Sequence, residues 1–179
     1  MNCEPEILET GLIGIDRLVD DIVRIGSRND RLVLETATVL HHGLDLEKPV
    51  KIEDLFALEK AILGGSMSMP KTALDDLTRH DFSDGIYIRT LIIPGGMFLT
   101  GAIHKLAHMS VLAGGDISIL TVDGVKRMKG SAVIQTRAGI KRVGYAHQYT
   151  VWMDILPNPT NERDVEKLWD MFYHNQKPE

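Results

Sequence analysis

The spacing of apolar residues divides the chain into a helical first part and a β-rich second part. Apolar side chains recur every three or four residues over 12–23, which predicts an amphipathic helix. Two further helical segments are predicted over 30–42 and 52–63, each followed by glycine at its C-terminal end. We interpret residues 66–84, which contain a short helical pattern at 72–77, as a connector.

After Gly85 the apolar period shortens from near 3.6 residues to two. Six short β-rich runs follow, separated by Gly, Pro or Asp-Gly, with no helical pattern between them. The pair Asp123-Gly124 is typical of a tight hairpin turn. Such a series predicts an antiparallel sandwich or barrel. The runs are "IYIRTLIIP", "GMFLTGAIH", "HMSVLAG", "DISILTVDG", "SAVIQTRAG" and "VGYAHQYTVWMDI".

The chain closes with a predicted helix. Asn161 and Asp164 resemble a capping box, and the apolar stripe over 165–172 indicates a helix that packs on the barrel. We therefore predict an α+β protein with a helical N-terminal region, an antiparallel β-barrel or jelly roll, and a C-terminal helix. The three regions are residues 1–80 with the connector, 81–156, and 157–179 with the tail.

Composition limits the classes of function. At 179 residues, 44% of them hydrophobic and 25% charged, the chain has the make-up of a soluble globular domain. No apolar run approaches the roughly 20 residues of a membrane span, and the acidic start "MNCEPEILET" lacks the pattern of a secretion signal. Cys3 is the only cysteine, which excludes an intrachain disulfide and a zinc–thiolate cluster and favours a cytoplasmic location.

The distribution of charge points to a small anionic ligand more than to nucleic acid. The net charge of −5 argues against bulk nucleic-acid binding. Residues 125–153, however, include no Asp or Glu, so this segment could hold an anionic small molecule or form a solvated positive face of a strand pair. Its basic residues are Lys126, Arg127, Lys129, Arg137, Lys141 and Arg142.

Two stretches of the β-rich part resemble the two motifs of the cupin superfamily of double-stranded β-helix barrels. They are "GAIHKLAHMSVLAGG" and "TRAGIKRVGYAHQYTVW". The closer similarity is to cupin-like proteins of bacteriophages whose function is uncharacterised. The resemblance implies a barrel whose interior carries the functional residues. It also implies an accessory protein in the host-cell cytoplasm.

The sequence departs from the metal-binding pattern of that family. Ala102 and Ala107 stand where the first motif has a histidine and a carboxylate, and Arg142 stands where the second motif has a histidine. We therefore expect no cofactor. The alternative is a divalent transition metal (Zn, Fe, Mn or Ni), for which the ligand set would be His104, His108 and His147. A further alternative makes His108 a core histidine hydrogen-bonded to backbone.

Arg142 is then expected to replace the metal in function. An arginine inside a barrel can bind a phosphate or carboxylate through two parallel hydrogen bonds. Alternatively, Arg142 forms an ion pair with Asp123 or Asp154, and Trp152 is an ordinary core residue. The predicted ligand-binding residues are His104, Lys141, Arg142, Tyr145, His147 and Trp152.

Three hypotheses of function follow. The first is a bacteriophage-type accessory protein that binds a small anion, such as a nucleotide signal, in its barrel. The second is a metal-dependent cupin enzyme, for example an isomerase, lyase or dioxygenase. The third is a structural or assembly protein whose helical N-terminal part forms a homo-oligomer while the barrel serves as a rigid scaffold. The amphipathic helix at 12–23 is the feature behind it, and packing of that helix on the protein's own barrel explains the same pattern equally well. No serine-hydrolase elbow, P-loop or dinucleotide-binding fingerprint is present.

Overall fold

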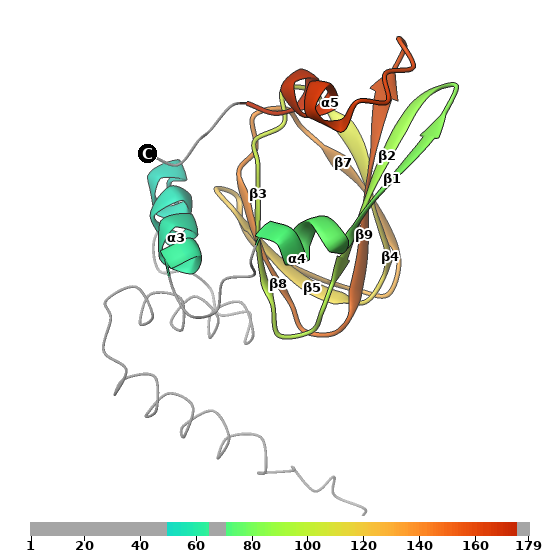
Figure 1. Ribbon diagram of the computed structural model, residues 1–179. Coiled ribbons are helices and arrows are strands. Elements are labelled where there is room, and N and C mark those ends of the chain that lie inside the picture. The colour runs from blue at the N-terminus through green and yellow to red at the C-terminus, as the bar shows by residue number, and fades with distance from the viewer. Residues whose placement is uncertain (1–49, 65–70, 175–179) are drawn as a thin grey trace, which may run out of the picture.

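The computed structural model describes residues 50–64 and 71–174. The helices predicted over 12–23 and 30–42, and the oligomerisation assigned to the first of them, lie outside the described residues. Figure 1 shows two facing β-sheets with three described helices around them. The helices are α3 (Ile52–Gly64), α4 (Lys71–Asp76) and α5 (Val165–Phe172). The strands are β1 (Thr78–Ser83), β2 (Gly85–Ile93), β3 (Phe98–Gly101), β4 (His108–Gly114), β5 (Asp116–Thr121), β6 (Gly124–Lys129), β7 (Ala132–Thr136), β8 (Arg142–Ala146) and β9 (Thr150–Asn158).

The strands form one five-stranded and one four-stranded sheet. Their orders are β1-β2-β9-β4-β7 and β3-β8-β5-β6, and every pairing is antiparallel. This arrangement of antiparallel sheets with a few helices agrees with the predicted class and is consistent with a cupin-type jelly roll. None of the three described helices has the length and apolar content needed to span a membrane.

The main core lies between the sheets because alternate strand residues point inward. Along β9 every second residue from Thr150 to Asn158 is buried, so Trp152 and Asp154 share the inner face. Leu91 of β2, Leu112 of β4 and Ile117 of β5 pack with Trp152 in one cluster. Asp154 is therefore a charged residue on the inner face of a sheet.

The helix α3 covers the outer face of the four-stranded sheet. Its residues Leu55, Leu58 and Ile62 recur at helical spacing and pack against Phe98 and Val143. Acidic side chains in its first turn stabilise the helix by interacting with the positive end of the helix dipole. The helix ends at Gly64, the glycine predicted to end it. The prediction of a helix over 52–63 is confirmed.

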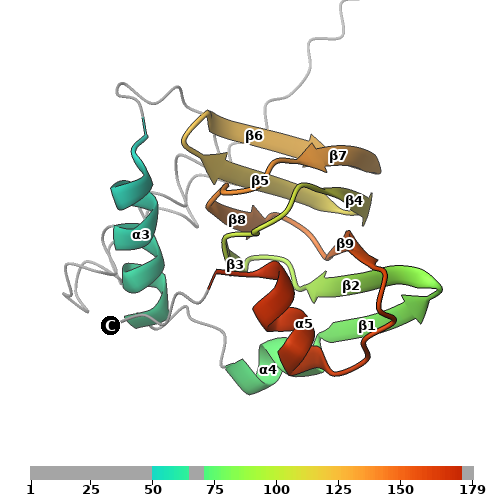
Figure 2. The ribbon, with the colours of Figure 1, turned by 90° about the horizontal axis from the view of Figure 1, so that it is seen from above.

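The helix α5 lies at one end of the two sheets (Figure 1). Seen from that end, it stands in front of the space flanked by β3 and β2 (Figure 2). The N-cap is Asp164, whose side chain accepts hydrogen bonds from Glu166 N and Lys167 N. The predicted capping role of Asn161 is wrong: this residue has φ of 54° and its side chain instead accepts a hydrogen bond from Gly85 N.

Three strand predictions need correction. The connector contains β1, a polar edge strand whose alternation of half-buried and exposed residues carries little apolar signal. The run "VGYAHQYTVWMDI" is divided between β8 and β9, which belong to different sheets. The predicted β5–β6 hairpin is present, but Thr121 pairs with Gly124, so Val122 and Asp123 form its turn.

The pair Gly114-Gly115 carries the chain from one sheet to the other. It follows β4 of the five-stranded sheet and precedes β5 of the four-stranded sheet. Gly115 has φ of +119°, and a Cβ there would lie 2.5 Å from Thr150 Oγ1 and 2.6 Å from Thr150 Cα. Both the backbone angle and the close approach of β9 require glycine at this position.

We expect Gly115→Ala to destabilise the fold by about 3 kcal/mol, because the new methyl group meets backbone and the φ angle is strained. Urea unfolding at equilibrium measures this loss. The matched control is Gly114→Ala, where a Cβ meets nothing within 4 Å. Equal stability of the two variants would contradict the account of this crossing.

Candidate functional site

A pocket of about 110 Å³ lies between the two sheets, and Trp169 of α5 contributes to its lining. Residues from both sheets and from the C-terminal segment line it. One part of the lining is aliphatic, and the other part is polar or aromatic, which is the usual composition of a small-molecule site. The polar and aromatic part includes Arg89, His104, Arg142, Trp152, Asp154 and Tyr173.

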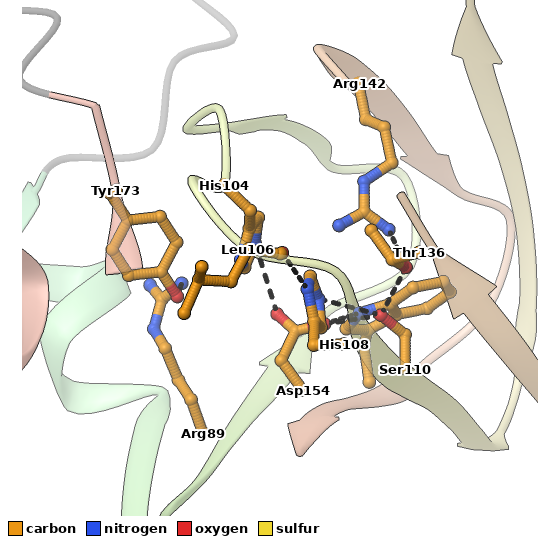
Figure 3. Close-up of polar contacts among 10 residues, drawn as sticks. Arg89, His104, Leu106, His108, Ser110, Thr136, Arg142, Asp154 and Tyr173 are labelled. Carbon is orange, nitrogen blue, oxygen red and sulfur yellow. Dashed lines mark hydrogen bonds and ion pairs between the residues drawn. The ribbon is translucent and has the colours of Figure 1, made fainter. Parts of the chain in front are cut away.

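Two arginines face this pocket from opposite sheets. Arg89 belongs to β2 and Arg142 to β8, and Figure 3 shows them pointing toward the same group of residues from opposite sides. Aromatic rings contact both guanidinium groups: Arg142 Cζ is 5.6 Å from the ring centre of Trp152, and Arg89 Cζ is 5.6 Å from that of Trp169. Burial lowers the pKa of Arg142, against the opposing effect of Asp154.

Neither arginine has a carboxylate in direct contact within the described part of the chain. Among residues 50–64 and 71–174, no salt bridge to a carboxylate involves Arg89 or Arg142. Their hydrogen bonds are long, at 3.5 Å from Arg89 Nη1 to Tyr173 Oη and 3.3 Å from Arg142 Nη1 to Thr136 Oγ1. The pocket therefore holds two cationic groups whose donors are mostly unused.

Asp154 is the only carboxylate among the residues that line the pocket, and it is deeply buried. Its Oδ1 accepts hydrogen bonds from Ser110 Oγ at 2.7 Å and Trp152 Nε1 at 3.0 Å, and lies 3.3 Å from His108 Nε2. Burial alone would raise the pKa of Asp154, but the bonds from His108 and Ser110 and the charge of Arg142 outweigh it and hold the pKa below its usual value. Asp154 is therefore ionised.

A chain of hydrogen bonds joins Arg142 to this carboxylate (Figure 3). Arg142 donates to Thr136 Oγ1, which lies 2.9 Å from Ser110 Oγ, and Ser110 donates to Asp154. The hydroxyl groups of Thr136 and Ser110 thus link the position of the Arg142 side chain to that of Asp154. Such a fully connected network favours one arrangement of the site.

His104 and His108 meet at this carboxylate, but not along a regular strand. His108 begins β4, whereas His104 lies in the preceding loop and forms an isolated β-bridge with Tyr173. Their rings stack with centroids 4.0 Å apart, and His104 Nε2 is 4.0 Å from Asp154 Oδ2. Burial, reinforced by His108 and the two arginines, lowers the pKa of His104 from 6.5 to about 3.

The C-terminal segment holds the His104 loop in place. Lys105 N donates a hydrogen bond to Phe172 O, and His174 N donates to Ile103 O. The ring of Tyr173 lies 4.5 Å from that of His104. Because α5 and the residues after it cover this end of the pocket, the site depends on contacts between segments about 70 residues apart.

A second, more open pocket of about 460 Å³ lies beside β6 and β7, and it shares Ile119, Arg142 and Trp152 with the first. Arg142 therefore lies between the two spaces. Lys126 and Arg137 also line the open pocket. Asp123, which pairs with Arg137, lines it as well, so the charged residues of the open pocket are mostly positive.

The residues at the centre of the site fit a divalent transition metal. Ligand atoms of His104, His108 and Asp154 all lie within 4.8 Å of one another, and two imidazoles with a carboxylate suit Zn, Fe, Mn or Ni. Nδ1 of His104 is buried without a hydrogen-bond partner among the described residues. His108 Nδ1 lies 3.3 Å from Leu106 O, a backbone contact that directs Nε2 toward the carboxylate.

The structure brings together only part of the predicted ligand-binding set. His104, Arg142 and Trp152 line the pocket. Tyr145 does not: it points from β8 to the other side of the sheet, packs against the α3 cluster and lies 5.0 Å from the Phe98 ring. The reason is alternation, since Arg142, Gly144 and Ala146 occupy the inward positions of β8.

Lys141 is also absent from the pocket lining. Its side chain is buried beneath α3, where Nζ donates to Glu59 Oε1 and Gly101 O and lies 5.3 Å from the centre of the Phe56 ring. This buried ion pair fastens α3 to the four-stranded sheet. Its role is structural.

We expect Lys141→Met to destabilise the protein by about 2 to 3 kcal/mol, because Glu59 and Gly101 O lose their partner. The double variant Lys141→Met/Glu59→Leu should recover part of the loss, since it leaves no unpaired carboxylate. Urea unfolding of the single and double variants measures the coupling. Additive losses would contradict a buried pair.

His147 does not join the other two histidines. It follows β8, and its Nε2 lies 2.8 Å from Ser118 Oγ, while its ring meets Tyr145 edge-on. The structure brings His104 and His108 together with Asp154, and the metal set of His104, His108 and His147 stays a prediction. The alternative that His108 is a buried histidine near backbone also agrees with its contact to Leu106 O.

Neither Arg89 nor the central role of Asp154 was predicted, although the sequence contains a signal for both. In "IYIRTLII" Arg89 alternates with Tyr87 and Leu91, which are buried. In "TVWMDI" Asp154 is two residues from Trp152. A charged residue at an inward position of an apolar strand is costly unless it has a function or a partner, and this rule would have identified both.

No protein-family model matches the sequence, and no curated protein matches it. Among solved structures, the chain is similar to a cupin-2 domain protein from Shewanella frigidimarina, with 12% identity over 45% of this chain and 78% of that chain and a TM-score of 0.38. It is also similar to a protein with a double-stranded β-helix domain from Klebsiella pneumoniae, with 9% identity over 50% of this chain and 90% of that chain and a TM-score of 0.40. A third similar structure is a cupin domain from Bordetella pertussis, with 12% identity over 45% of this chain and 90% of that chain and a TM-score of 0.36. These values carry no argument about function, so the site is interpreted from its own geometry.

Proposed function

We propose that the protein binds a small anion in the pocket between the two sheets. The observation that carries the proposal is the pair of guanidinium groups, Arg89 and Arg142, that face one pocket without a salt bridge among the described residues. Asp154, the carboxylate beside them, already accepts bonds from Ser110 and Trp152. An anion would supply the acceptors that the arginines lack.

The cost of burying charge supports this proposal. An unpaired guanidinium in a protein interior loses hydration that only hydrogen bonds and an opposite charge restore. The lowered pKa of Arg142, caused by burial, is the signature of that cost. A bound carboxylate or phosphate would remove it through parallel hydrogen bonds to the guanidinium edge.

The pocket volume narrows the proposal to small acids. In a space of about 110 Å³, a nucleotide would not fit, so the nucleotide signal is the less favoured ligand. The bacteriophage accessory role and the host-cell cytoplasm stay predictions from the sequence resemblance. The assembly role and the homo-oligomer also stay predictions, because the helix assigned to them lies outside the described residues.

The test is isothermal titration calorimetry, in which the full-length protein is titrated with inorganic phosphate and with a series of small carboxylic acids. We expect at least one anion to bind, and Arg142→Met to weaken that binding by roughly 30-fold or more because a charge-assisted contact is lost. The matched control is Arg79→Met, an exposed arginine of β1. Binding that is insensitive to Arg142→Met, or equally sensitive to Arg79→Met, would refute the proposal.

A second candidate function is metal-dependent catalysis at His104, His108 and Asp154. Two observations favour it: the unpartnered Nδ1 of His104, and the position of His108, both of whose ring nitrogens face oxygen acceptors. An ionised carboxylate oxygen is only an acceptor, so a ring nitrogen beside it either donates a proton to it or binds the same cation as the carboxylate. When bound, such a metal acts as a Lewis acid, and Ser110 and Trp152 would keep Asp154 oriented.

Metal analysis of the purified protein and calorimetry with Zn²⁺ and Ni²⁺ test this candidate. Stoichiometric binding that falls at least about 10-fold in His104→Gln would support it, because a first ligand is lost. His80→Gln, at a histidine of β1 bonded to Tyr87, is the control. Absence of binding in the native protein would exclude the metal and leave the anion site as the function.

A further inference from the structure

We infer that the anion is a short dicarboxylate, with one carboxylate at Arg89 and the other at Arg142. The inference deepens the proposed function and rests on it. It starts from the topology: β2 and β8 belong to different sheets, so the two guanidinium groups approach the pocket from opposite walls (Figure 3). A ligand that bonds to both guanidinium groups needs acceptors on two sides, which a dicarboxylate provides with one carboxylate for each arginine.

Each arginine is held by aromatic rings and presents free donors. Arg89 lies against Trp169 and Tyr173, at 5.6 and 5.8 Å from the ring centres, and Arg142 lies against Trp152. A guanidinium has five N–H donors, and the structure gives each of these two arginines one long hydrogen bond to a described residue. The remaining donors suit a planar carboxylate, which accepts two parallel bonds from one arginine.

The unused donors of the two arginines leave room for two carboxylates in the pocket. Asp154 is turned toward Ser110, Trp152 and His108, and none of the described carboxylates forms a salt bridge with either arginine. A single carboxylate would therefore bond to one guanidinium and leave most donors of the other unused. Two carboxylates satisfy both.

Part of the pocket wall is aliphatic. Leu91, Leu99, Ile117 and Ile119 line the pocket together with Gly144. These residues fit the hydrocarbon spacer of a diacid and offer no partner for polar groups along it. A volume of about 110 Å³ limits the spacer to a short hydrocarbon chain.

The experiment is calorimetry on the full-length protein with four probes: succinate, glutarate, the monocarboxylate butyrate, and inorganic phosphate. We expect succinate or glutarate to bind about 30-fold more tightly than butyrate, because the second carboxylate adds a charge-assisted contact. Arg89→Met and Arg142→Met should each reduce that ratio to near one. Arg79→Met should leave it unchanged.

The outcomes separate the inference from the proposed function. Equal affinity for succinate, glutarate and butyrate would overturn the dicarboxylate and leave anion binding standing. If phosphate binds more tightly than all three acids, the ligand is one compact anion between the arginines. That result would also overturn the dicarboxylate and leave anion binding standing. If none of the four probes binds, both the inference and the anion site fall. The melting temperature of each variant verifies its folding, and Arg89→Gln replaces Arg89→Met if the latter does not fold.

Discussion

Replacing Asp154 by alanine should cost about 4 kcal/mol of folding free energy, because three buried groups lose their acceptor at once. Ser110, which is fully buried, would keep only its contacts with Thr136 and His108, and Trp152 Nε1 would keep no partner that the structure shows. The inner face of β9 would carry a cavity lined by unsatisfied donors. Equilibrium unfolding in urea, followed by tryptophan fluorescence, measures the loss.

Two further variants make this result specific to the buried carboxylate. Asp154→Asn keeps an oxygen acceptor and removes the charge, so it should fall between the native protein and Asp154→Ala. Asp123→Ala removes an exposed carboxylate that pairs with Arg137 and should change stability by less than about 1 kcal/mol. If Asp154→Ala were as stable as Asp123→Ala, the hydrogen-bond network would not organise the site.

Acidification should destabilise the protein through His104 before it protonates Asp154. The pKa of His104 is about 3 when folded and 6.5 in its ordinary state, so the unfolded chain binds a proton in this interval and the folded protein does not. The contribution of His104 is complete above pH 6.5 and is lost as the pH falls toward 3, with a slope on the order of 1 kcal/mol per pH unit. The pKa of Asp154 is held below its usual value, so its contribution is lost only at lower pH.

Urea unfolding at a series of pH values between 7 and 4, in the presence of EDTA, measures this slope. The control is His104→Gln, which cannot titrate, so the fall in stability over the same interval should be shallower. Parallel curves for the native protein and the variant would show that His104 is protonated in the folded state. That result would contradict the burial assigned to it.

The periodicity of the sequence predicted most of the described fold. The change of period after Gly85 marked the start of the barrel, and "HMSVLAG" coincides with β4 from His108 to Gly114. The strand β1 was missed because its residues alternate between half-buried and exposed, with Phe82 as its only large apolar side chain. Hydrophobic patterning does not identify a polar edge strand.

The site was predicted less well, for two different reasons. Lys141 and Arg142 are neighbours, yet one is fixed under α3 and the other faces the pocket, because adjacent strand positions point to opposite faces. That distinction was available from alternation. The meeting of His104 and His108 was not, since His104 lies in a loop whose position depends on its β-bridge with Tyr173. Local sequence carries no signal for such a contact.

The most direct test of the anion pocket is mass spectrometry of small molecules released by denaturation from the freshly purified, full-length protein. The account predicts a small organic acid or phosphate in the native protein and its loss from the double variant Arg89→Met/Arg142→Met. Recovery of a neutral or cationic molecule instead, or of the same acid in equal amount from the double variant, would contradict it.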